Sequence, residues 1–493
     1  MPNLDIPLIC DDGTINIALD TINKGKQALV FVNSKRSAEK VAEEISKKLK
    51  AESQKKLSED VLKALQKPTR QCERLAKCIV KGIAFHHAGL HSKQKSLVED
   101  SFKEGKIKII CCTPTLAAGL DLPAFRAIIR DVKRYADRIG MSYIPVLEYL
   151  QMAGRAGRPK YDTYGEAIIV SNAEGEKNAV TDKYVFGEAE SIYSKLAVEP
   201  ALRKHVLSLI SAQVVRSYAE INKFFSKTFW AHQYKDMGKL EDIMEKVLLL
   251  LQKWDFVQLV DEKYRATILG KRVAELYIDP LTAHNFLTGL KRANKPNSFS
   301  FIHLVSNSPE MYPLLKIKQK EFDDFQNKMM IHDANLLVLE PSMFDIDYED
   351  YMNSSKTALM LYDWAEEKDD EYLYENYGIR PGETRVKLET ADWLLFAIHE
   401  LAHIENHNEL LKDIAKTRFR LKNGVKEELI PLLKFKKVGR VRARALFSSG
   451  VKDLAGVKKA SISELTSILG KKIAESVKNQ IEGKKVNEQL TQE

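Results

Sequence analysis

Short apolar runs alternate with amphipathic stretches along the first 180 residues. Residues 28–32 form an apolar run that predicts a strand, and Asn33 and Ser34 can cap a helix that continues to Leu49. Further strands are predicted at 79–84, 107–112, 127–129 and 167–170. Amphipathic helical stretches, such as 92–102, lie between them. This alternation predicts a parallel sheet with helices on both faces, which binds ligands beyond the carboxyl ends of its strands.

The pattern becomes helical after residue 185. A two-strand signal at 256–260 and 266–268 follows three helical stretches, which is the element order of a winged helix. Residues 279–410 read as almost entirely helical, and a small basic helical module follows. We therefore expect a multi-domain chain with boundaries at 1–180, 181–277, 278–410 and 411–493.

Composition excludes several protein classes. The chain has 493 residues, of which 44% are hydrophobic and 29% charged, so its domains can bury cores and are not disordered. No apolar run approaches the ~20 residues that a membrane span needs. The first residues lack the basic-then-apolar order of a secretory signal, so we expect a cytoplasmic protein without a membrane partner. Five cysteines without a CxxC pair indicate reduced thiols, and no zinc or other metal site.

The positive charge is concentrated at the carboxyl end. The net charge is +9, yet residues 412–493 alone hold 20 Lys and Arg against 9 Asp and Glu. A basic terminal module on a near-neutral body predicts a polyanionic partner, most commonly nucleic acid. A solvated lysine-rich tail is the alternative interpretation of the charge alone.

The strongest chemical signal is QMAGRAGRP at residues 151–159. Arg155 and Arg158 are three residues apart, and each follows a glycine, Gly154 or Gly157, which lets a phosphate chain or a facing backbone come close. The planar fork of arginine binds phosphate oxygens bidentately and keeps its charge. The alternative is a solvent-exposed Gly/Arg turn.

A second signal, CTPTLAAGLDLP at 112–123, directly follows a predicted strand. The hydroxyl of Thr113 and nearby backbone N–H groups can hold a phosphodiester at the carboxyl end of that strand. The carboxylate of Asp121 can accept a hydrogen bond from a ribose hydroxyl.

Together with FVNSKRSAEK at 31–40 and FHHAGL at 85–90, these segments resemble motifs IV, IVa, V and VI of the second RecA-like domain of superfamily 2 helicases, in the Ski2-like form. Residues 194–205 and 224–230 resemble the winged helix of the archaeal Hjm-type DNA helicases. Residues 389–394 resemble their ratchet helix, and 437–446 their helix–hairpin–helix. The expected fold is thus a RecA-like α/β domain, a winged helix, a helical ratchet bundle and a basic helix–hairpin–helix domain.

The resemblance assigns roles to the motif residues. Arg155, Arg158 and Gln151 would be catalytic, and Gly119, Asp121, Gly154 and Gly157 would line the nucleotide site. Ser34, Arg36, His87 and Thr113 would contact the DNA strand. The whole enzyme would use ATP and Mg²⁺ to move 3′–5′ and unwind forked or branched DNA in repair and recombination.

The motifs that cradle ATP are missing from the sequence. Six Gly-Lys pairs occur, but Ser or Thr follows none of them, and neither Asp-Glu pair continues as a magnesium-binding motif. We expect that the first RecA-like domain is absent, that a separate copy of it would be a partner, and that this chain hydrolyses ATP poorly or not at all. This interpretation requires that Arg155 and Arg158 face a triphosphate on another lobe and are not locked in internal ion pairs.

Three further segments are candidates for nucleic-acid contact. Residues 131–144 can form a β-hairpin that turns near Gly140, and in Ski2-like DNA helicases a hairpin here separates the strands. The candidate contact residues in this hairpin are Lys133, Arg134, Tyr135 and Tyr143. An ordinary surface hairpin with its aromatic side chains packed below is the alternative.

Trp393 lies on a helix predicted from Thr384 to Asn406, with Arg385 and Lys387 two turns earlier. A Trp and a cation on one helix face can grip a single strand, as the family's ratchet helix does. A buried core Trp is the alternative. The same helix contains HELAH at 399–403, which matches the HExxH pattern of zinc proteases, but we expect no zinc there.

Gly439 lies in an apolar–Gly–apolar hairpin that presents backbone N–H groups to a phosphate, and Arg440, Arg442 and Arg444 add charge. A helix-capping role for this glycine is the alternative. The sequence therefore favours the carboxyl-terminal part of a DNA helicase that binds single-stranded and forked DNA in the nucleoid. A Ski2-like RNA helicase and a non-catalytic DNA-binding regulator built on a RecA-like scaffold remain as alternatives.

Overall fold

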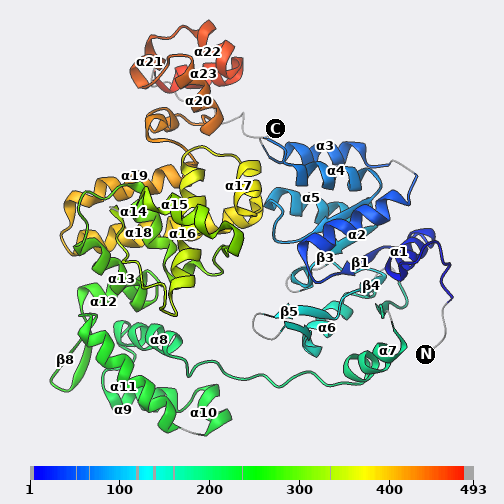
Figure 1. Cartoon of the computed structure of the whole chain (residues 1–493), viewed down its shortest axis with the longest axis horizontal. Helices are drawn as coiled ribbons and strands as arrows, with labels where there is room; N and C mark the ends of the chain where they lie inside the picture. Colours follow the sequence, from blue (N-terminus) through cyan, green and yellow to red (C-terminus); the bar gives the residue numbers. More distant parts are fainter. Residues whose placement is uncertain are drawn as a thin grey trace. The chain divides into compact units, whose positions relative to one another are not determined.

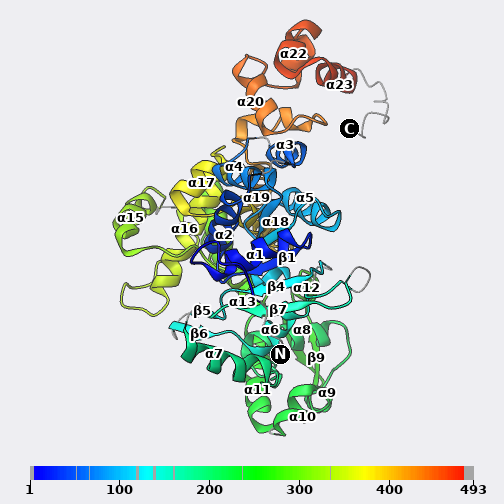
Figure 2. The same ribbon diagram turned by 90° about the vertical axis from the view of Figure 1, so that its right-hand side faces the viewer.

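The chain forms two compact units (Figures 1 and 2). Unit 1 comprises residues 1–192 and 379–384, and unit 2 comprises 193–378 and 385–493. The computed structural model describes residues 5–50, 53–65, 67–117, 122–136, 140–158, 162–171, 173–235, 237–332 and 335–481.

A five-stranded parallel sheet is the centre of unit 1. Its order is β2-β3-β1-β4-β7, and each neighbouring pair is parallel, with Ala28 of β1 level with Ile109 and Arg126. The strands are β1 (Ala28–Phe31), β2 (Ile83–His86), β3 (Ile109–Cys112), β4 (Arg126–Ile129) and β7 (Glu166–Ile169). All four residues of β1, β2, β3 and β4 are buried, as in strands covered on both faces. The predicted parallel sheet is confirmed.

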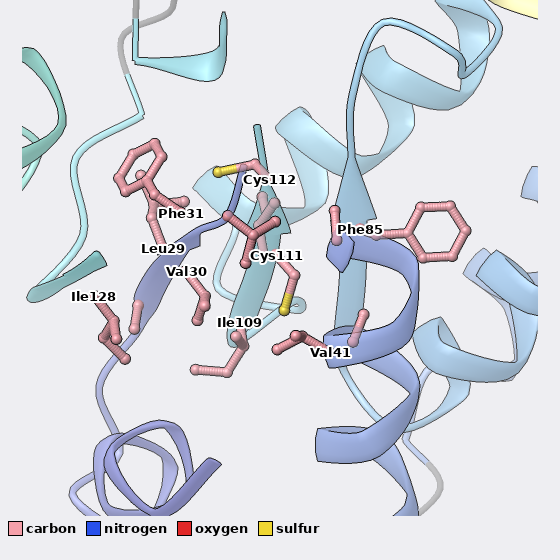
Figure 3. Close-up of a cluster of buried hydrophobic side chains, with 14 of the residues drawn as sticks. Leu29, Val30, Phe31, Val41, Phe85, Ile109, Cys111, Cys112 and Ile128 are labelled. Carbon is pink, nitrogen blue, oxygen red and sulfur yellow. The ribbon is translucent and has the colours of Figure 1, made fainter. Parts of the chain in front are cut away.

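Helices cover this sheet and close its core. They are α1 (Gly13–Asn23), α2 (Lys35–Lys47), α3 (Lys55–Lys63), α4 (Arg70–Val80), α5 (Ser92–Lys103), α6 (Val146–Ala153) and α7 (Glu174–Val180). Helices α2 and α4 pack on β2, whereas α1 and α6 pack on β4. The core between them contains Leu29, Phe31, Val41, Ile109 and Ile128 (Figure 3).

Two predicted strands differ from the structure. The expected strand at 79–84 is in fact the end of α4 followed by β2, because Gly82, at φ +73°, turns the chain between them. The second wing strand is β9 (Lys263–Ala266), which ends where we expected it to begin. Thr267 then caps α12 by accepting a hydrogen bond from the Gly270 N–H at 2.9 Å, so Ile268 starts a helix.

Unit 2 begins with a winged helix. Its elements are α8 (Glu199–Ser211), α9 (Tyr218–Phe225), α10 (Phe229–Tyr234), α11 (Met237–Lys253), β8 (Val257–Val260), β9 and α12 (Ile268–Glu275). Strands β8 and β9 pair antiparallel, and α8 packs against α11 and α12. This confirms the expected winged helix.

A helical bundle and a small tail follow, and all of their residues except 379–384 belong to unit 2. The bundle comprises α13 (Pro280–Lys291), α14 (Ser298–Ser306), α15 (Phe322–Met330), α16 (Tyr348–Ala365), α17 (Asp370–Tyr377), α18 (Pro381–Ile404) and α19 (Asn408–Asn423). The tail comprises α20 (Arg440–Ser448), α21 (Leu454–Lys459), α22 (Ile462–Leu469) and α23 (Lys471–Ile481), which share one apolar core. None of the described helices is both long and apolar enough to cross a membrane.

Candidate nucleotide and nucleic-acid sites

The loop after α6 places Arg155 and Arg158 beside β4. Its backbone is fixed on Ala124, whose N–H donates to the Arg155 carbonyl at 2.9 Å and whose carbonyl accepts from the Gly157 N–H at 2.7 Å. Gly157 has φ +98°, a conformation that favours glycine. The backbone of Ala124 therefore faces this loop at hydrogen-bonding distance. Gln151 is exposed on the last turn of α6.

Both guanidinium groups bind oxygen atoms of the protein itself. The Nε of Arg155 donates to the Ala117 carbonyl at 3.1 Å. The Nε of Arg158 donates to Asp162 at 2.7 Å, and its NH1 donates to the Gln27 side chain at 2.7 Å. The hydrogen bond from Arg158, together with Lys26, lowers the pKa of Asp162, so this carboxylate stays charged. Our requirement that neither arginine be locked in an internal ion pair is thus not met for Arg158.

The segment after β3 provides Thr113 at the carboxyl end of the strand. Its N–H donates to the His86 carbonyl at 3.4 Å, and its hydroxyl lies 2.9 Å from that of Thr115. The side chain is half-buried, so its hydroxyl is partly accessible. Gly119 and Asp121, the other predicted residues of this segment, lie outside the described residues.

The residues of the two upstream motifs differ in accessibility. Ser34 and Arg36 are exposed at the start of α2, where the Ser34 hydroxyl accepts from the Ser37 N–H at 3.1 Å. His87 is 0% exposed, and its ring stacks on Phe85. A strand contact through the His87 side chain is therefore wrong for this conformation, because the ring is enclosed by protein.

Strands β5 (Lys133–Ala136) and β6 (Gly140–Tyr143) form the predicted hairpin. Tyr135 is 72% exposed, whereas Tyr143 is 37% exposed, packs edge-on against Tyr184 and lies under the Lys133 ammonium. Lys133 pairs with Glu176 at 2.8 Å and Arg134 with Glu148 at 2.9 Å. The Tyr135 ring is thus the more accessible of the two for a base, and the turn itself lies outside the described residues.

Helix α18 carries three of the predicted contacts. The Trp393 ring is half-buried, and its Nε1–H donates to the Leu276 carbonyl at 3.0 Å. Arg385 is exposed and pairs with Glu389 at 2.7 Å. Lys387 is only 8% exposed, and its Nζ donates to the carbonyls of Met311 and Pro313. The predicted strand contact of Lys387 is wrong, because this ammonium holds a backbone turn inside the bundle.

A cavity of about 360 Å³ lies between α18 and α19, and sequence reasoning missed it. Arg418 pairs with Asp392 at 2.9 Å and lies 4.9 Å from the centre of the Phe396 ring. Lys422 and Phe419 also line the cavity. Cations and aromatic rings suit a nucleic-acid strand, but they come from two helices that meet only in the fold, so no single motif marks them.

The HExxH segment borders the same cavity. Glu400 binds Arg272 at 2.8 Å, so its carboxylate is engaged in an ion pair. In the part of the chain that the structure describes, no three His, Cys, Asp or Glu side chains are grouped as metal ligands.

Two arginines of the tail hold it to the bundle. Arg440 lies 4.6 Å from the centre of the Trp364 ring and donates to the Lys368 carbonyl at 3.0 Å. Arg444 pairs with Glu367 at 2.6 Å. Arg442 is exposed and donates to a nearby carbonyl at 2.9 Å, and Gly439 caps α20. Of the three arginines, Arg442 is thus the most accessible to a phosphate.

Four family models match the chain in sequence. They are "Helicase conserved C-terminal domain" at 13–160, "Helix-turn-helix domain" at 165–258, "Archaeal helicase, domain 4" at 299–424 and "SAM-like Helix-hairpin-helix tandem" at 429–482. Their order follows that of the sheet domain, winged helix, bundle and tail in the structure.

Curated relatives match almost the whole chain. The proteins named ATP-dependent DNA helicase Hel308 of Pyrococcus abyssi and Methanocella arvoryzae are 40% and 37% identical to it over 94% and 97% of its residues. The protein of the same name from Caldivirga maquilingensis is 34% identical over 94%. The chain spans 65% of the length of each of these relatives. In its sequence and in the order of its domains, the chain is similar to the archaeal Hel308 helicases, which are Ski2-like.

Proposed function

We propose that this chain is the carboxyl-terminal part of an ATP-dependent DNA helicase that moves 3′–5′ and unwinds forked or branched DNA. The observation that carries the proposal is the order of the four matched segments: a helicase domain, a helix-turn-helix domain, an archaeal helicase domain 4 and a helix–hairpin–helix tandem. The relatives are named DNA helicases, which favours neither the RNA-helicase nor the regulator alternative.

In this proposal the chain has four domains. Residues 1–180 are the second RecA-like domain, 181–277 the winged helix, 278–410 the ratchet bundle and 411–493 the DNA-binding tail. The protein would act on nucleoid DNA in the cytoplasm. Single-stranded and forked DNA would be its partners, with a first RecA-like domain that carries the phosphate-binding loop.

The residues around Arg155 fit a polyphosphate. Both guanidinium groups already hold oxygen acceptors, the Ala117 carbonyl and the Asp162 carboxylate, which phosphate oxygens can replace. We propose that Arg155 and Arg158 bind the phosphates of ATP, with Gln151, Gly154 and Gly157 shaping the loop. ATP with Mg²⁺ would supply the energy of movement when the other domain is present.

Contacts to the strand would come from accessible side chains of both units. In unit 1 these are Ser34, Arg36, Thr113 and the hairpin residues Tyr135, Lys133 and Arg134. In unit 2, Trp393 would stack on a base, Arg385 would bind a phosphate, and Arg442 with the Gly439 hairpin would bind the duplex backbone. Gly119 and Asp121 keep their proposed roles from the sequence.

Binding and ATP turnover by the 493-residue chain test the proposal. We expect binding to a forked DNA at least about tenfold tighter than to an RNA fork of the same sequence, and binding that weakens steeply with salt. We expect ATP turnover at the level of buffer, with or without DNA. Equal affinity for both polymers would contradict the DNA assignment, and DNA-stimulated turnover by this chain alone would contradict the divided ATP site.

A further inference from the structure

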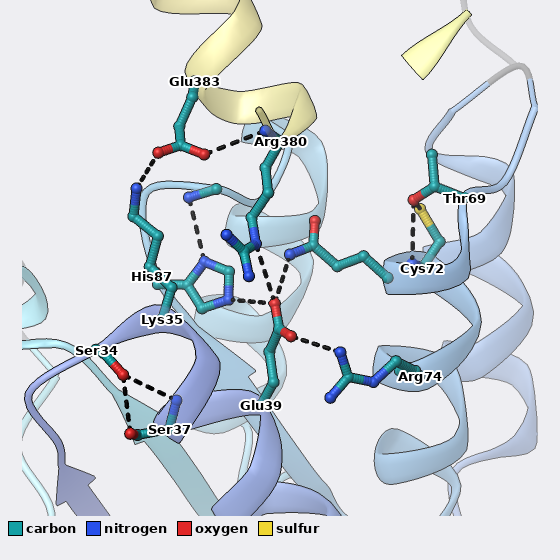
Figure 4. A network of polar contacts seen from close by, with 12 residues as sticks. Ser34, Lys35, Ser37, Glu39, Thr69, Cys72, Arg74, His87, Arg380 and Glu383 are labelled. Carbon is teal, nitrogen blue, oxygen red and sulfur yellow. Dashed lines mark hydrogen bonds and ion pairs between the residues drawn. The ribbon is translucent and has the colours of Figure 1, made fainter. Parts of the chain in front are cut away.

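The carboxylate of Glu39 contacts side chains from three other segments of unit 1 (Figure 4). Glu39 lies on α2 and is 2% exposed. Arg74 and Gln71 of α4 contact it at 2.5 and 2.8 Å. Nε2 of His87, in the loop after β2, lies 3.2 Å away, and Nε of Arg380, just before α18, lies 3.3 Å away.

The charge state of this cluster is defined by its hydrogen bonds. The Nδ1 of His87 accepts from the Gly89 N–H at 3.1 Å, so Nε2 carries the ring proton, and it lies 3.2 Å from the Glu39 carboxylate. Burial lowers the pKa of His87 more than Glu39 raises it, so the ring is neutral. Burial also raises the pKa of Glu39, but its hydrogen bonds and the nearby arginines outweigh this and lower it to about 2. Glu39 is therefore a buried anion in contact with α4, with the loop after β2 and with the segment before α18.

The segment 379–384 docks on the same loop through its backbone. The Gly382 N–H donates to the Gly89 carbonyl at 3.1 Å, and a side chain at Gly382 would overlap the loop backbone. A side chain at Gly89 would in turn overlap that of Arg380. Glu383 pairs with Lys35 of α2 and accepts from the Arg380 N–H at 3.1 Å. Two glycines, an ion pair and Arg380 thus join this segment to α2 and the loop.

The contacts of Glu39 link segments that are far apart in sequence. Arg74 and Gln71 already join Glu39 of α2 to α4, whereas Arg380 comes from a position 341 residues away in sequence. The first turn of α18 belongs to unit 1, and the same helix continues without a break to Ile404 and carries Trp393.

We propose that Glu39 is a positioning residue that fastens the first turn of α18 to the His87–Leu90 loop, so that displacement of the loop is passed along the helix. This inference rests on the proposed function, in which the sheet domain moves during the ATP cycle and α18 holds the strand. Glu39 contacts neither ATP nor DNA in this role. It acts through Arg380 and His87.

Hydrogen exchange of the 493-residue chain tests the fastening directly. The Gly382 amide is bonded to the Gly89 carbonyl and not within its helix, so its exchange rate reports docking. We expect Arg380→Gln and Glu39→Gln to speed its exchange by about tenfold or more, while amides of Ile83–His86 exchange as before. Arg380→Gln leaves the other contacts of Glu39 in place and so serves if Glu39→Gln unfolds unit 1. Unchanged exchange at Gly382 in Arg380→Gln would overturn the inference.

A charge reversal separates positioning from general stability. Lys35 and Glu383 are each about a third exposed, so both tolerate substitution. Lys35→Glu and Glu383→Lys should each speed exchange at Gly382, and the two together should restore it. Failure of the pair to restore protection would count against fastening through these side chains.

DNA affinity connects the fastening to the proposed function. In anisotropy titrations with a labelled oligothymidylate, we expect Arg380→Gln to weaken binding by about three- to tenfold. The reason is that α18 and the loop after β2 are no longer joined, so their DNA-contacting side chains must be ordered when DNA binds. If the wild-type chain binds no DNA, the proposed function fails, and the exchange measurements still decide whether the docking exists. If Arg380→Gln loosens Gly382 without weakening DNA binding, the transmission role is overturned.

Discussion

Replacing Trp393 distinguishes a stacking residue from a core residue. The ring is half-buried, and its Nε1–H edge is bound to the Leu276 carbonyl, so only part of the ring is accessible to a base. Stacking on an aromatic side chain contributes about 1–3 kcal/mol per base, which corresponds to roughly 5- to 150-fold in affinity. We expect Trp393→Ala to weaken binding of an oligothymidylate by about tenfold, in the lower part of that range.

The matched variant is Trp393→Phe, which keeps a ring and removes only the Nε1–H donor. It leaves the Leu276 carbonyl without this partner, so we expect a loss of about 1 kcal/mol in the free energy of unfolding. Its affinity for DNA should remain within about threefold of wild type, because a benzene ring still stacks.

Two measurements on the same samples decide the outcome. Fluorescence anisotropy at fixed salt gives the dissociation constant, and urea unfolding followed by circular dichroism gives the stability. Trp393→Ala should lose about 2–3 kcal/mol of stability as well, since the Trp393 side chain is partly buried. A Trp393→Ala protein that loses stability but binds DNA as tightly as wild type would refute the stacking role and identify a core Trp.

Further predictions concern buried charges and the tail. Arg126 is 0% exposed and pairs with Asp20 at 2.6 Å, so Arg126→Met should lower the free energy of unfolding by about 3–5 kcal/mol in urea titrations. The fold lowers the pKa of Glu39 to about 2, so its charged form stabilises the folded state. This contribution to the free energy of unfolding is complete above the unfolded pKa near 4.5 and is lost as the pH falls towards 2. After allowance for solvent screening we expect about 1–2 kcal/mol, and Glu39→Gln should remove this pH dependence. Arg442→Gln should weaken DNA binding and reduce the slope of log affinity against log salt concentration by about 1. The guanidinium of Arg444 is engaged in ion pairs with Glu367 and Glu428, so Arg444→Gln should change stability in urea titrations more than it changes DNA affinity.

The sequence predicted the sheet well because its strands are short, continuous apolar runs. The predicted strands at 127–129 and 167–170 lie within one residue of β4 and β7. The prediction failed at β2, because only Lys81 and Gly82 separate the apolar end of α4 from the strand, and the hydrophobic period alone does not place this boundary. The wing strand was displaced for a similar reason, since the capping role of Thr267 depends on where the preceding turn ends.

The motifs of the candidate site could be predicted from the sequence, but most of the residues that pair with the motif side chains could not. The ion pair of Arg158 with Asp162 spans four residues and could have been read from the sequence. The carbonyls that hold Lys387 are 74 and 76 residues away, and the contact from Arg380 to Glu39 spans 341. Such pairs depend on tertiary packing, so spacing rules for helices and loops carry no information about them.

The central claim is that Arg155 and Arg158 complete an ATP site whose other half lies in another domain. The most direct measurement is DNA-dependent ATP turnover after this chain is mixed with the part of the Pyrococcus abyssi relative that it does not match. We expect turnover only in the mixture, and a loss of about 10³-fold or more with Arg155→Ala but none with Arg292→Ala, an exposed arginine of unit 2. Equal turnover in mixtures with wild-type and Arg155→Ala chains would contradict the account.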